Sequence, residues 1–320
     1  MSSDISARSK GRLLNIRDLR EYKPPPARHL IHSGILNIGS RLIIFGDEGT
    51  FKSALAVHAA FSLARASKWM GFSTSQCNIL YIQGEMSLSM TKERIEQYCE
   101  GSKAIYLARP AKVPNEAQRA EEFAYPPNII METLVQDVSL DTQNGYQFLR
   151  SELELMITEL PEHPIILIVD PLFKLFRYDL VKEEDMKVLT SNLDKLMRDV
   201  ELFRSHPGMA VIIVHHTRKA QVDKDGNILV SPRSMDMFGS GHLKWWADTI
   251  IRSDLDEKDE TDSSIRLTFA KHRIARYPPP KRIDLYWDRD TYHPFITNII
   301  RASRPDTIRE FRGMDLGLLE

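Results

Sequence analysis

Cysteine is nearly absent from the chain, since Cys77 and Cys99 are the only two among 320 residues. Two cysteines exclude a disulfide framework and any metal site built from several cysteines. Long apolar runs are also missing: the longest, Ile165–Val169 and Met209–Val214, fall far below the roughly 20 residues that span a bilayer. The first dozen residues carry no apolar core of the kind that a secretory signal has. These absences predict a cytoplasmic protein that has no membrane partner.

Neither sign of charge predominates. Lysine and arginine total 43 and aspartate and glutamate total 44, which gives a net charge of −1. Hydrophobic residues make up 42% and charged residues 27%, the ordinary balance of a globular protein with a full core. A surface for nucleic acid must therefore be a local patch, because the chain as a whole is neither basic nor acidic.

From Arg41 onward, short apolar runs alternate with helical stretches. The runs predicted to be buried strands are Leu42–Phe45, Ile79–Ile82, Ile165–Val169 and Val211–Val214. The stretches predicted to be helices are Ser53–Ala66, Ser89–Glu100, Gly145–Glu159 and Glu183–Phe203. This alternation predicts an α/β fold with a mainly parallel central sheet flanked by helices. Two later runs, Ile265–Phe269 and Ile283–Trp287, predict an antiparallel extension at the C-terminal end. We expect an N-terminal arm over 1–30, one domain over 31–300 and a tail over 301–320.

The strongest motif follows the first predicted strand and opens the first predicted helix. Its residues are Gly46, Asp47, Glu48, Gly49, Thr50, Phe51, Lys52 and Ser53. In this position, successive backbone N–H groups and the helix dipole form a nest for phosphates. We expect Lys52 to neutralise the β- and γ-phosphates of ATP and the Ser53 hydroxyl to ligate Mg²⁺. Phe51 departs from the G-x-x-x-x-G-K-[ST] pattern, which has glycine there, so a chance strand–turn–helix with a buried lysine is the competing interpretation.

Carboxylates follow two further predicted strands. Asp170 ends the apolar run Ile165–Val169, the Walker B arrangement, in which it would hold Mg²⁺ directly or through water. Glu85 follows the run Ile79–Ile82 and would lie in the crevice where parallel sheets bind ligands. There it could orient or deprotonate the water that attacks the γ-phosphate. The alternative is that Glu85 caps the helix that begins near Ser89.

Two histidines, His215 and His216, follow the strand Met209–Val214. Adjacent side chains of an extended strand point to opposite sides, so the pair is a poor joint metal site. One of the two histidines could instead contact the γ-phosphate.

Together these residues resemble the RecA-like ATPases, and within them the DnaB-type and RepA-type hexameric replicative helicases of plasmids, phages and mobile elements. The resemblance covers about residues 31–300. It rests on the loop that ends in Phe51, Lys52 and Ser53, on Gly84-Glu85-Met86, on Asp170, and on Gly239-Ser240-Gly241 with Ala247-Asp248. It implies a RecA-like P-loop fold with ATP and Mg²⁺ as cofactors. It also implies Glu85 as the catalytic carboxylate and His216 as the γ-phosphate sensor.

A basic pair, Lys271 and Arg273, follows the predicted strand Ile265–Phe269. The two side chains share one face of an extended chain because they are two residues apart. The resemblance implies that they reach the ATP of a neighbouring copy, so that the chain works as a homo-oligomer, a hexamer in this family. The alternative is a basic, solvent-exposed strand end.

A long connection over 217–244 carries five lysines and arginines against three aspartates, which gives 5 − 3 = +2. A loop of this length inside a compact domain is usually functional. The resemblance places it on single-stranded DNA, where Arg218, Lys219, Lys224 and Arg233 would follow the phosphates. Trp245 and Trp246 could stack on bases, but their helical context favours packing in the core.

These interpretations combine into an ATP-dependent DNA helicase or translocase that hydrolyses ATP at subunit interfaces and moves on single-stranded DNA. Replication or mobile-element proteins would be its further partners. The alternative is a non-motor, ATP-gated assembly switch: a loader, a regulator of recombination or transposition, or a signalling ring. Turnover stimulated by single-stranded DNA would distinguish the motor from the switch.

Overall fold

The structure is a computed structural model that describes residues 15–21, 29–109, 114–133, 138–177, 182–203, 206–217, 221–222, 228–230, 241–256, 259, 261–273 and 280–301. The helices are α1 (Ile16–Glu21), α2 (Lys52–Ala64), α3 (Leu88–Leu107), α4 (Glu116–Ala124), α5 (Gln143–Glu159), the 3₁₀ helix η2 (Leu172–Leu175), α6 (Glu183–Leu202) and α7 (Gly241–Trp246). The strands are β1 (His29–Ile31), β2 (Leu36–Asn37), β3 (Arg41–Gly46), β4 (Lys68–Trp69), β5 (Phe72–Ser73), β6 (Asn78–Gln83), β7 (Ile129–Thr133), β8 (Ile165–Asp170), β9 (Met209–His216), β10 (Gln221–Val222), β11 (Ile228–Val230), β12 (Thr249–Leu255), β13 (Ser264–His272), β14 (Pro280–Asp288) and β15 (His293–Arg301).

A nine-stranded sheet organises the molecule, in the order β15-β14-β13-β12-β3-β9-β8-β6-β7. The strands from β12 to β7 run parallel to one another, and β13, β14 and β15 continue the sheet as antiparallel hairpins. The predicted fold class, a mainly parallel sheet with an antiparallel extension at the C-terminal end, is therefore confirmed.

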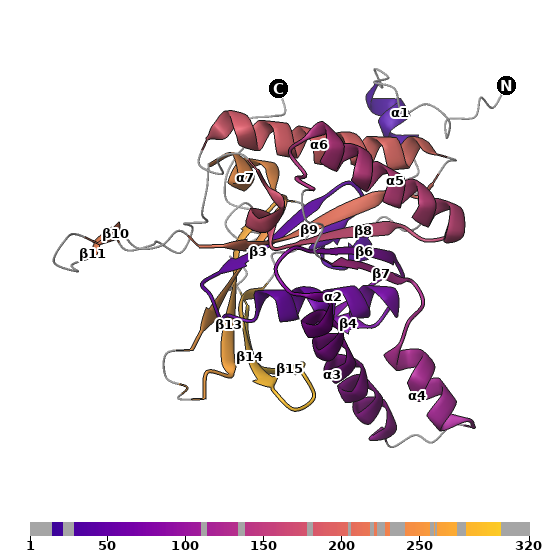
Figure 1. Cartoon of the computed structure of the whole chain (residues 1–320), viewed down its shortest axis with the longest axis vertical. Helices are drawn as coiled ribbons and strands as arrows, with labels where there is room; N and C mark the ends of the chain where they lie inside the picture. The colour runs from indigo at the N-terminus through magenta and orange to yellow at the C-terminus, as the bar shows by residue number, and fades with distance from the viewer. Residues whose placement is uncertain are drawn as a thin grey trace, which may run out of the picture.

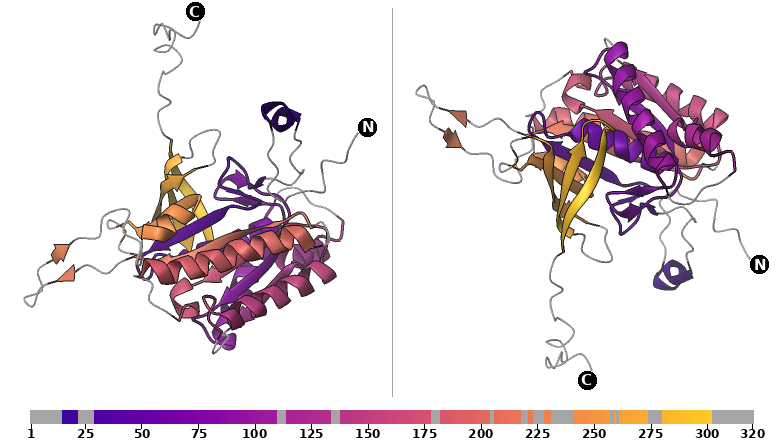
Figure 2. Two further views of the ribbon diagram at one scale, coloured as in Figure 1. Left: turned by 90° about the horizontal axis from the view of Figure 1, so that it is seen from above. Right: turned by 90° about the horizontal axis from the view of Figure 1, so that it is seen from below.

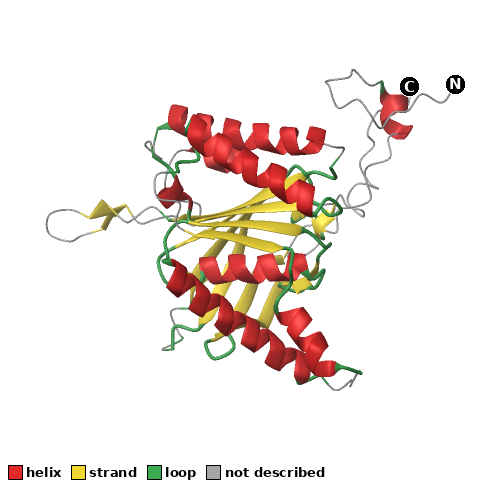
Figure 3. Ribbon diagram, turned by 45° about the vertical axis from the view of Figure 1, so that its right-hand side comes forward, coloured by secondary structure: helices red, strands yellow, loops and turns green. Residues whose placement is uncertain are grey.

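Helices cover both faces of the parallel part of the sheet. Figure 1 shows α5, α6 and α7 on one face and α2 and α3 on the other, and the views in Figure 2 and Figure 3 show the same layers. The strands feed two cores because their side chains alternate: Ile44 packs on the α2 face, whereas Ile43 and Phe45 pack on the α5–α6 face. This burial on both sides explains why the central strands are continuous apolar runs.

The two ends of the parallel strands form two opposite edges of the sheet. At the carboxyl edge, Gly46 pairs with His216 and Gln83 pairs with Asp170. At the amino edge, the backbone of Asp248 bonds to Arg41, the first residue of β3. We call these the carboxyl edge and the amino edge below, because the candidate site residues divide between them.

Several described elements differ from the predictions. Helix α3 continues to Leu107, beyond the predicted end at Glu100. Strands β7 and β12 were not predicted, and β12 lies beside β3 in the middle of the sheet.

Among the described helices, none is long and apolar enough to cross a membrane.

Candidate nucleotide site

A cavity of about 450 Å³ opens at the carboxyl edge, where β3, β6, β8 and β9 end. It is lined by Glu48, Gly49, Phe51, Lys52, Ser53, Ala54, Gln83, Glu85, Met86, Met90, Arg94, Pro171, Val214, His216 and Tyr292. The cavity thus brings together residues of the phosphate-loop motif with Glu85 and His216, from three separate strand ends. Of these lining residues, Arg94 and Tyr292 belong to no motif that the sequence analysis identified.

The turn between β3 and α2 is held in shape by β12. A Cβ atom on Gly46 would lie 2.1 Å from the carbonyl oxygen of Ser253, so glycine is required where the two strands approach. The Ser253 hydroxyl donates a hydrogen bond of 2.6 Å to the carbonyl of Thr50. Gly49 has a φ of 80°, a conformation that residues with a Cβ rarely adopt. Both glycines of the motif therefore have a backbone reason to be there.

Asp47 connects the same turn to the end of β9. Its carboxylate accepts a hydrogen bond from the Thr217 hydroxyl, and its backbone carbonyl accepts one of 2.8 Å from the Thr50 hydroxyl. The backbone N–H of Thr217 also donates to the carbonyl of Gly46, at 3.1 Å. Asp47 is therefore placed to hold the loop, whereas Glu48 lines the cavity itself.

Phe51 adopts the left-handed backbone conformation that the missing glycine would supply, with φ 57° and ψ 22°. For a residue with a Cβ this conformation costs about 1–2 kcal/mol. The Phe51 ring stacks on the Trp287 ring at 5.2 Å between centroids, and the Arg289 guanidinium lies 5.7 Å from its centroid. Burial and stacking of an aromatic pair offset a cost of this size. The departure from the motif is thus accommodated by the β14–β15 hairpin.

Lys52, the first residue of α2, is buried with its ammonium group inside the loop. Its Nζ donates to the carbonyl of Asp47 and, at 3.4 Å, to the hydroxyl of Thr50. Burial lowers the pKa of Lys52, while the negative charges of Asp170 and Asp47 act in the opposite direction. A phosphate group in the loop would supply the buried ammonium with a close counter-charge.

Ser53 and Asp170 form an oxygen pair at the base of the cavity. The Ser53 hydroxyl donates to Oδ1 of Asp170 at 2.9 Å, and the Tyr81 hydroxyl donates to Oδ2 at 2.5 Å. Asp170 is fully buried; burial raises the pKa of its carboxyl group, and the hydrogen bonds from Tyr81 and Ser53 act in the opposite direction. A hydroxyl and a carboxylate are the hard oxygen ligands that Mg²⁺ takes beside nucleotide phosphates, so the pair fits the predicted metal. Tyr81 carried no signal in the sequence beyond its place in a buried strand.

Glu85 is exposed in the cavity just beyond the end of β6. Its backbone N–H donates to the side-chain oxygen of Gln83 at 2.7 Å. The alternative role, capping of α3, is filled by Ser87, whose hydroxyl accepts from the N–H of Met90 at 3.4 Å. The carboxylate of Glu85 is therefore left facing the space where a nucleotide would lie.

The two histidines at the end of β9 lie on opposite sides of the strand, as expected for adjacent residues of an extended chain. His216 lines the cavity, with its ring edge-on to Phe173 at 4.8 Å between centroids. His215 is fully buried. Burial and the nearby charge of Lys52 lower the pKa of His216, which favours the neutral imidazole. Of the two histidines, His216 therefore lies in the nucleotide cavity and His215 lies in the protein interior.

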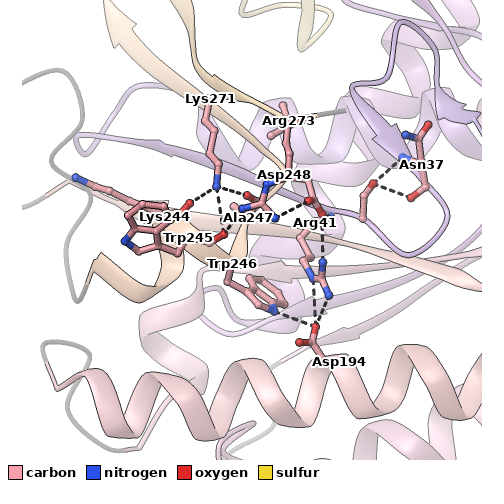
Figure 4. Close-up of polar contacts among 12 residues, drawn as sticks. Asn37, Arg41, Asp194, Lys244, Trp245, Trp246, Ala247, Asp248, Lys271 and Arg273 are labelled. Atoms are coloured by element: carbon pink, nitrogen blue, oxygen red, sulfur yellow. Dashed lines mark hydrogen bonds and ion pairs between the residues drawn. The ribbon is translucent and has the colours of Figure 1, made fainter. Parts of the chain in front are cut away.

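Lys271 and Arg273 lie at the amino edge, as Figure 4 shows. The ammonium of Lys271 donates to three carbonyls at the C-terminal end of α7 and just beyond it, those of Lys244, Trp245 (3.2 Å) and Ala247 (2.6 Å). The guanidinium of Arg273 donates to the Trp245 carbonyl at 2.7 Å and pairs with Asp248 at 3.4 Å.

The amino edge and the phosphate loop are separated by the length of β3. That strand has six residues, which corresponds to roughly 17 Å. Lys271 and Arg273 therefore lie beyond the reach of their own phosphate loop. Asp248, nearly buried between Arg41 and Arg273, fixes the base of this basic pair.

Arg94 and Tyr292 are the functional candidates that the sequence analysis missed. The Arg94 guanidinium lies 5.8 Å from the centroid of the Tyr292 ring, and both side chains line the cavity. Arg94 follows Met90 by four residues, which places the two on one side of α3. That spacing was a signal for Arg94. Tyr292 lies after β14, in a turn with φ 56°, and its place in the cavity depends on the fold of the C-terminal hairpin.

The candidate DNA contacts Arg218, Lys219, Lys224 and Arg233 lie outside the described residues, as do Gly239 and Ser240. They remain predictions.

The two tryptophans that follow differ. Trp246 is 8% exposed and packs in the α6–α7 core, whereas Trp245 is 77% exposed. The prediction of core packing is confirmed for Trp246 and wrong for Trp245, because the last turn of α7 turns one indole inward and the other outward.

Comparisons with known proteins identify the architecture. The family model of the AAA domain matches residues 6–222. A solved structure described as an ATPase domain has a TM-score of 0.57 at 15% identity, over 90% of this chain and 95% of that one. A DnaB-like replicative helicase, described with its interactions with primase, has a TM-score of 0.54 at 16% identity, over 83% of this chain and 58% of that one. No curated protein matches the chain. These two likenesses confirm the predicted RecA-like fold.

Proposed function

Because the chain belongs to the AAA domain family and has a RecA-like P-loop ATPase fold, we propose that it is a DNA translocase and helicase driven by ATP. It hydrolyses ATP with Mg²⁺ at the interfaces of a homo-oligomer, a hexamer, and moves on single-stranded DNA. The likeness to a solved ATPase domain and to a DnaB-like replicative helicase supports this class of activity.

The observation that carries the proposal is the position of Lys271 and Arg273 at the edge opposite the phosphate loop. A basic pair that cannot reach its own nucleotide reaches that of another copy when copies assemble head to tail. Such heterologous contacts close into rings when the rotation between copies closes. An arginine supplied from a neighbour stabilises the charge that develops on the transferred phosphoryl group.

Each of the cavity residues then has its own role in ATP hydrolysis. Lys52 binds the β- and γ-phosphates, and Ser53 and Asp170 would hold Mg²⁺, which supplies charge neutralisation between the phosphates when bound. Glu85 orients the attacking water and accepts its proton. Arg94 and Tyr292, which line the same cavity, offer a cation and an aromatic ring to the bound nucleotide.

The end of β9 links this chemistry to the proposed DNA contacts. His216 lines the cavity, and Thr217, the next residue, is bonded to Asp47 and Gly46 of the phosphate loop. The connection that carries Arg218, Lys219, Lys224 and Arg233 begins at this point. Loss of the γ-phosphate beside His216 would therefore act directly on the first residue of the DNA-binding connection.

The test is the ATPase rate per subunit, measured against protein concentration with and without single-stranded DNA, at low and high salt. We expect the rate to rise with protein concentration, because the sites form between copies. Stimulation by DNA should fall at high salt, because contacts to phosphates release counterions. Lys52→Ala, which removes the buried phosphate cation, should abolish turnover and serves as the background.

Two outcomes would overturn parts of the proposal. A rate per subunit that is independent of concentration, in a protein that remains monomeric, would contradict active sites between copies. Hydrolysis that rises with concentration but is indifferent to DNA would favour the ATP-gated assembly switch instead. A strand-displacement assay with a tailed duplex would then distinguish unwinding from assembly alone.

A further inference from the structure

Trp245, on the amino edge, is a strongly exposed hydrophobic residue, at 77%. It lies on the last turn of α7, and its carbonyl accepts hydrogen bonds from both Lys271 and Arg273. The exposed indole and the basic pair therefore form one patch (Figure 4). Tryptophan and arginine are the residues that most often carry the energy of protein interfaces. An exposed tryptophan beside two cations is thus a candidate contact surface.

A matching patch lies at the mouth of the nucleotide cavity, on the carboxyl edge. Leu88 and Met90, in the first turn of α3, are 70% and 56% exposed. Met90 also lines the cavity that contains Lys52 and Glu85. On this edge, as on the other, an apolar surface adjoins a charged one.

The charges of the two patches are opposite. The amino edge presents Lys271 and Arg273, whereas the exposed charged side chains that line the cavity are the carboxylates of Glu48 and Glu85; the two cations of the lining, Lys52 and Arg94, are buried and half-buried. Opposite potentials on two faces steer those faces together and fix their orientation. Because the two faces are on opposite edges of one sheet, they join two copies and not two parts of one copy.

We propose that Trp245 of one copy packs on Leu88 and Met90 of the next, and so places Lys271 and Arg273 of the first copy at the nucleotide of the second. This inference rests on the proposed function and specifies its interface. The Arg273 guanidinium donates a hydrogen bond of 2.7 Å to the backbone carbonyl of Trp245, so both residues would contact the same neighbouring copy. Trp245 is then the anchor that determines where the basic pair is delivered.

An exposed tryptophan beside lysines can also stack on a DNA base. The observations favour the protein partner, because the opposite edge of the same chain carries the complementary apolar and acidic surfaces. The experiments below distinguish the two occupants.

The first experiment is a pairwise cross-link between two variants, Trp245→Cys and Met90→Cys, in the full-length protein. Both native cysteines are buried, so the introduced thiols are the reactive ones on the described surface. The two variants are mixed with Mg²⁺ and a non-hydrolysable ATP analogue, at a protein concentration high enough for a chain without the Trp245 indole to assemble, and treated with a short bis-maleimide, which tolerates wider spacings than a disulfide. We expect a covalent dimer in the mixture and none in either variant alone.

The matched control replaces Met90→Cys by Leu155→Cys. Leu155 is 55% exposed on α5, away from both patches, so it reports collisional cross-linking. Equal yields from the Met90 and Leu155 partners would overturn the inference. A chain that stays monomeric with Mg²⁺ and the analogue would also overturn it, whatever its ATPase rate.

The second experiment measures assembly of Trp245→Ala by sedimentation, with Leu155→Ala as control. We expect the protein concentration at half-assembly to rise at least about tenfold for Trp245→Ala, the effect of losing an interface anchor, and not to change for the control. Unchanged assembly with weakened binding of single-stranded DNA would assign Trp245 to DNA instead. Cross-linking and assembly as expected, in a protein without DNA-stimulated turnover, would keep this interface and reject the proposed motor.

Discussion

Single residues at the cavity hold their neighbours in position, and Tyr81 is the simplest case. Its hydroxyl occupies Oδ2 of Asp170 and leaves Oδ1 facing Ser53, where Mg²⁺ would bind. A hydrogen bond to a charged group contributes about 1.5–3 kcal/mol. Tyr81→Phe should therefore raise the Mg²⁺ concentration at half-effect by about tenfold or more in the binding of a fluorescent ADP analogue.

The control for that prediction is Tyr98→Phe. The Tyr98 hydroxyl is also buried and bonded, to His58 at 2.9 Å, but it lies away from the cavity. Both variants should lose thermal stability, and only Tyr81→Phe should shift the Mg²⁺ dependence. Equal Mg²⁺ curves for the two variants would show that Tyr81 is only a structural residue.

Phe51 gives a second prediction at the scale of one residue. Its backbone is left-handed, which glycine adopts without cost and alanine does not. Phe51→Gly and Phe51→Ala both lose the stacking on Trp287. The glycine variant should nevertheless be the more stable of the two by about 1 kcal/mol in chemical denaturation. An alanine variant as stable as the glycine variant would mean that the loop does not retain this backbone conformation.

At the scale of elements, α2, α3 and β15 meet at a buried group of aromatic and imidazole rings. His58 of α2 bonds to Tyr98 of α3, whose ring stacks on His293 of β15 at 4.1 Å. Burial, with the nearby positive charges of His293 and Arg65, lowers the pKa of His58 to about 3. The native protein therefore keeps His58 neutral at a pH where the unfolded chain protonates it.

The sign of the resulting pH dependence follows from proton uptake. Between about pH 6.5, the pKa of an unfolded histidine, and about pH 3, the unfolded state binds more protons, so the free energy of unfolding falls as the pH falls. His58→Gln should remove up to about 1.4 kcal/mol per pH unit of this slope. Denaturation curves at pH 7, 6 and 5 measure it. Parallel slopes in the two proteins would contradict a neutral, buried His58.

How much of the fold was predictable depended on how each strand is buried. Strands β6, β8 and β9 are covered on both faces and appear as continuous apolar runs such as Ile165–Val169. Strand β12 was missed because Arg252 and Asp254 interrupt its apolar residues, although it lies next to β3. Helix α4 was missed because only its alanines, Ala120 and Ala124, are buried.

The residues of the site also fall into those that the sequence could predict and those that it could not. Lys52, Glu85, Asp170 and His216 follow strands that the sequence reveals, so their place at the carboxyl edge could be predicted. Tyr81, Arg94 and Tyr292 could not, because their contacts join segments far apart in the sequence; Tyr81 and Asp170, for example, are 89 residues apart. The roles of all these residues remain predictions.

At the scale of the whole molecule, the two opposite edges make a prediction about mixtures. Arg273→Ala damages the amino edge and Glu85→Gln damages the carboxyl edge, so each variant alone should have little activity. In an equal mixture, about a quarter of head-to-tail interfaces would combine an intact edge of each kind. The ATPase rate of the mixture should therefore exceed that of either variant. The control mixture combines Arg273→Ala with Lys271→Ala, which damage the same edge, and should show no gain in ATPase rate. If the first mixture also shows no gain, although cross-linking proves that its two variants assemble together, the result would count against active sites between copies.

The position of β12 determines which piece of the chain can stand alone. The family similarity ends at residue 222, after the phosphate loop, Glu85, Asp170 and His216. Yet β12, from Thr249, pairs with β3 and supplies the Ser253 carbonyl and hydroxyl against which the phosphate loop is packed. A fragment cut at 222 would keep the whole motif and expose β3 as an apolar edge strand, a predicted site of aggregation. A soluble expression fragment must therefore extend beyond residue 222 and include β12.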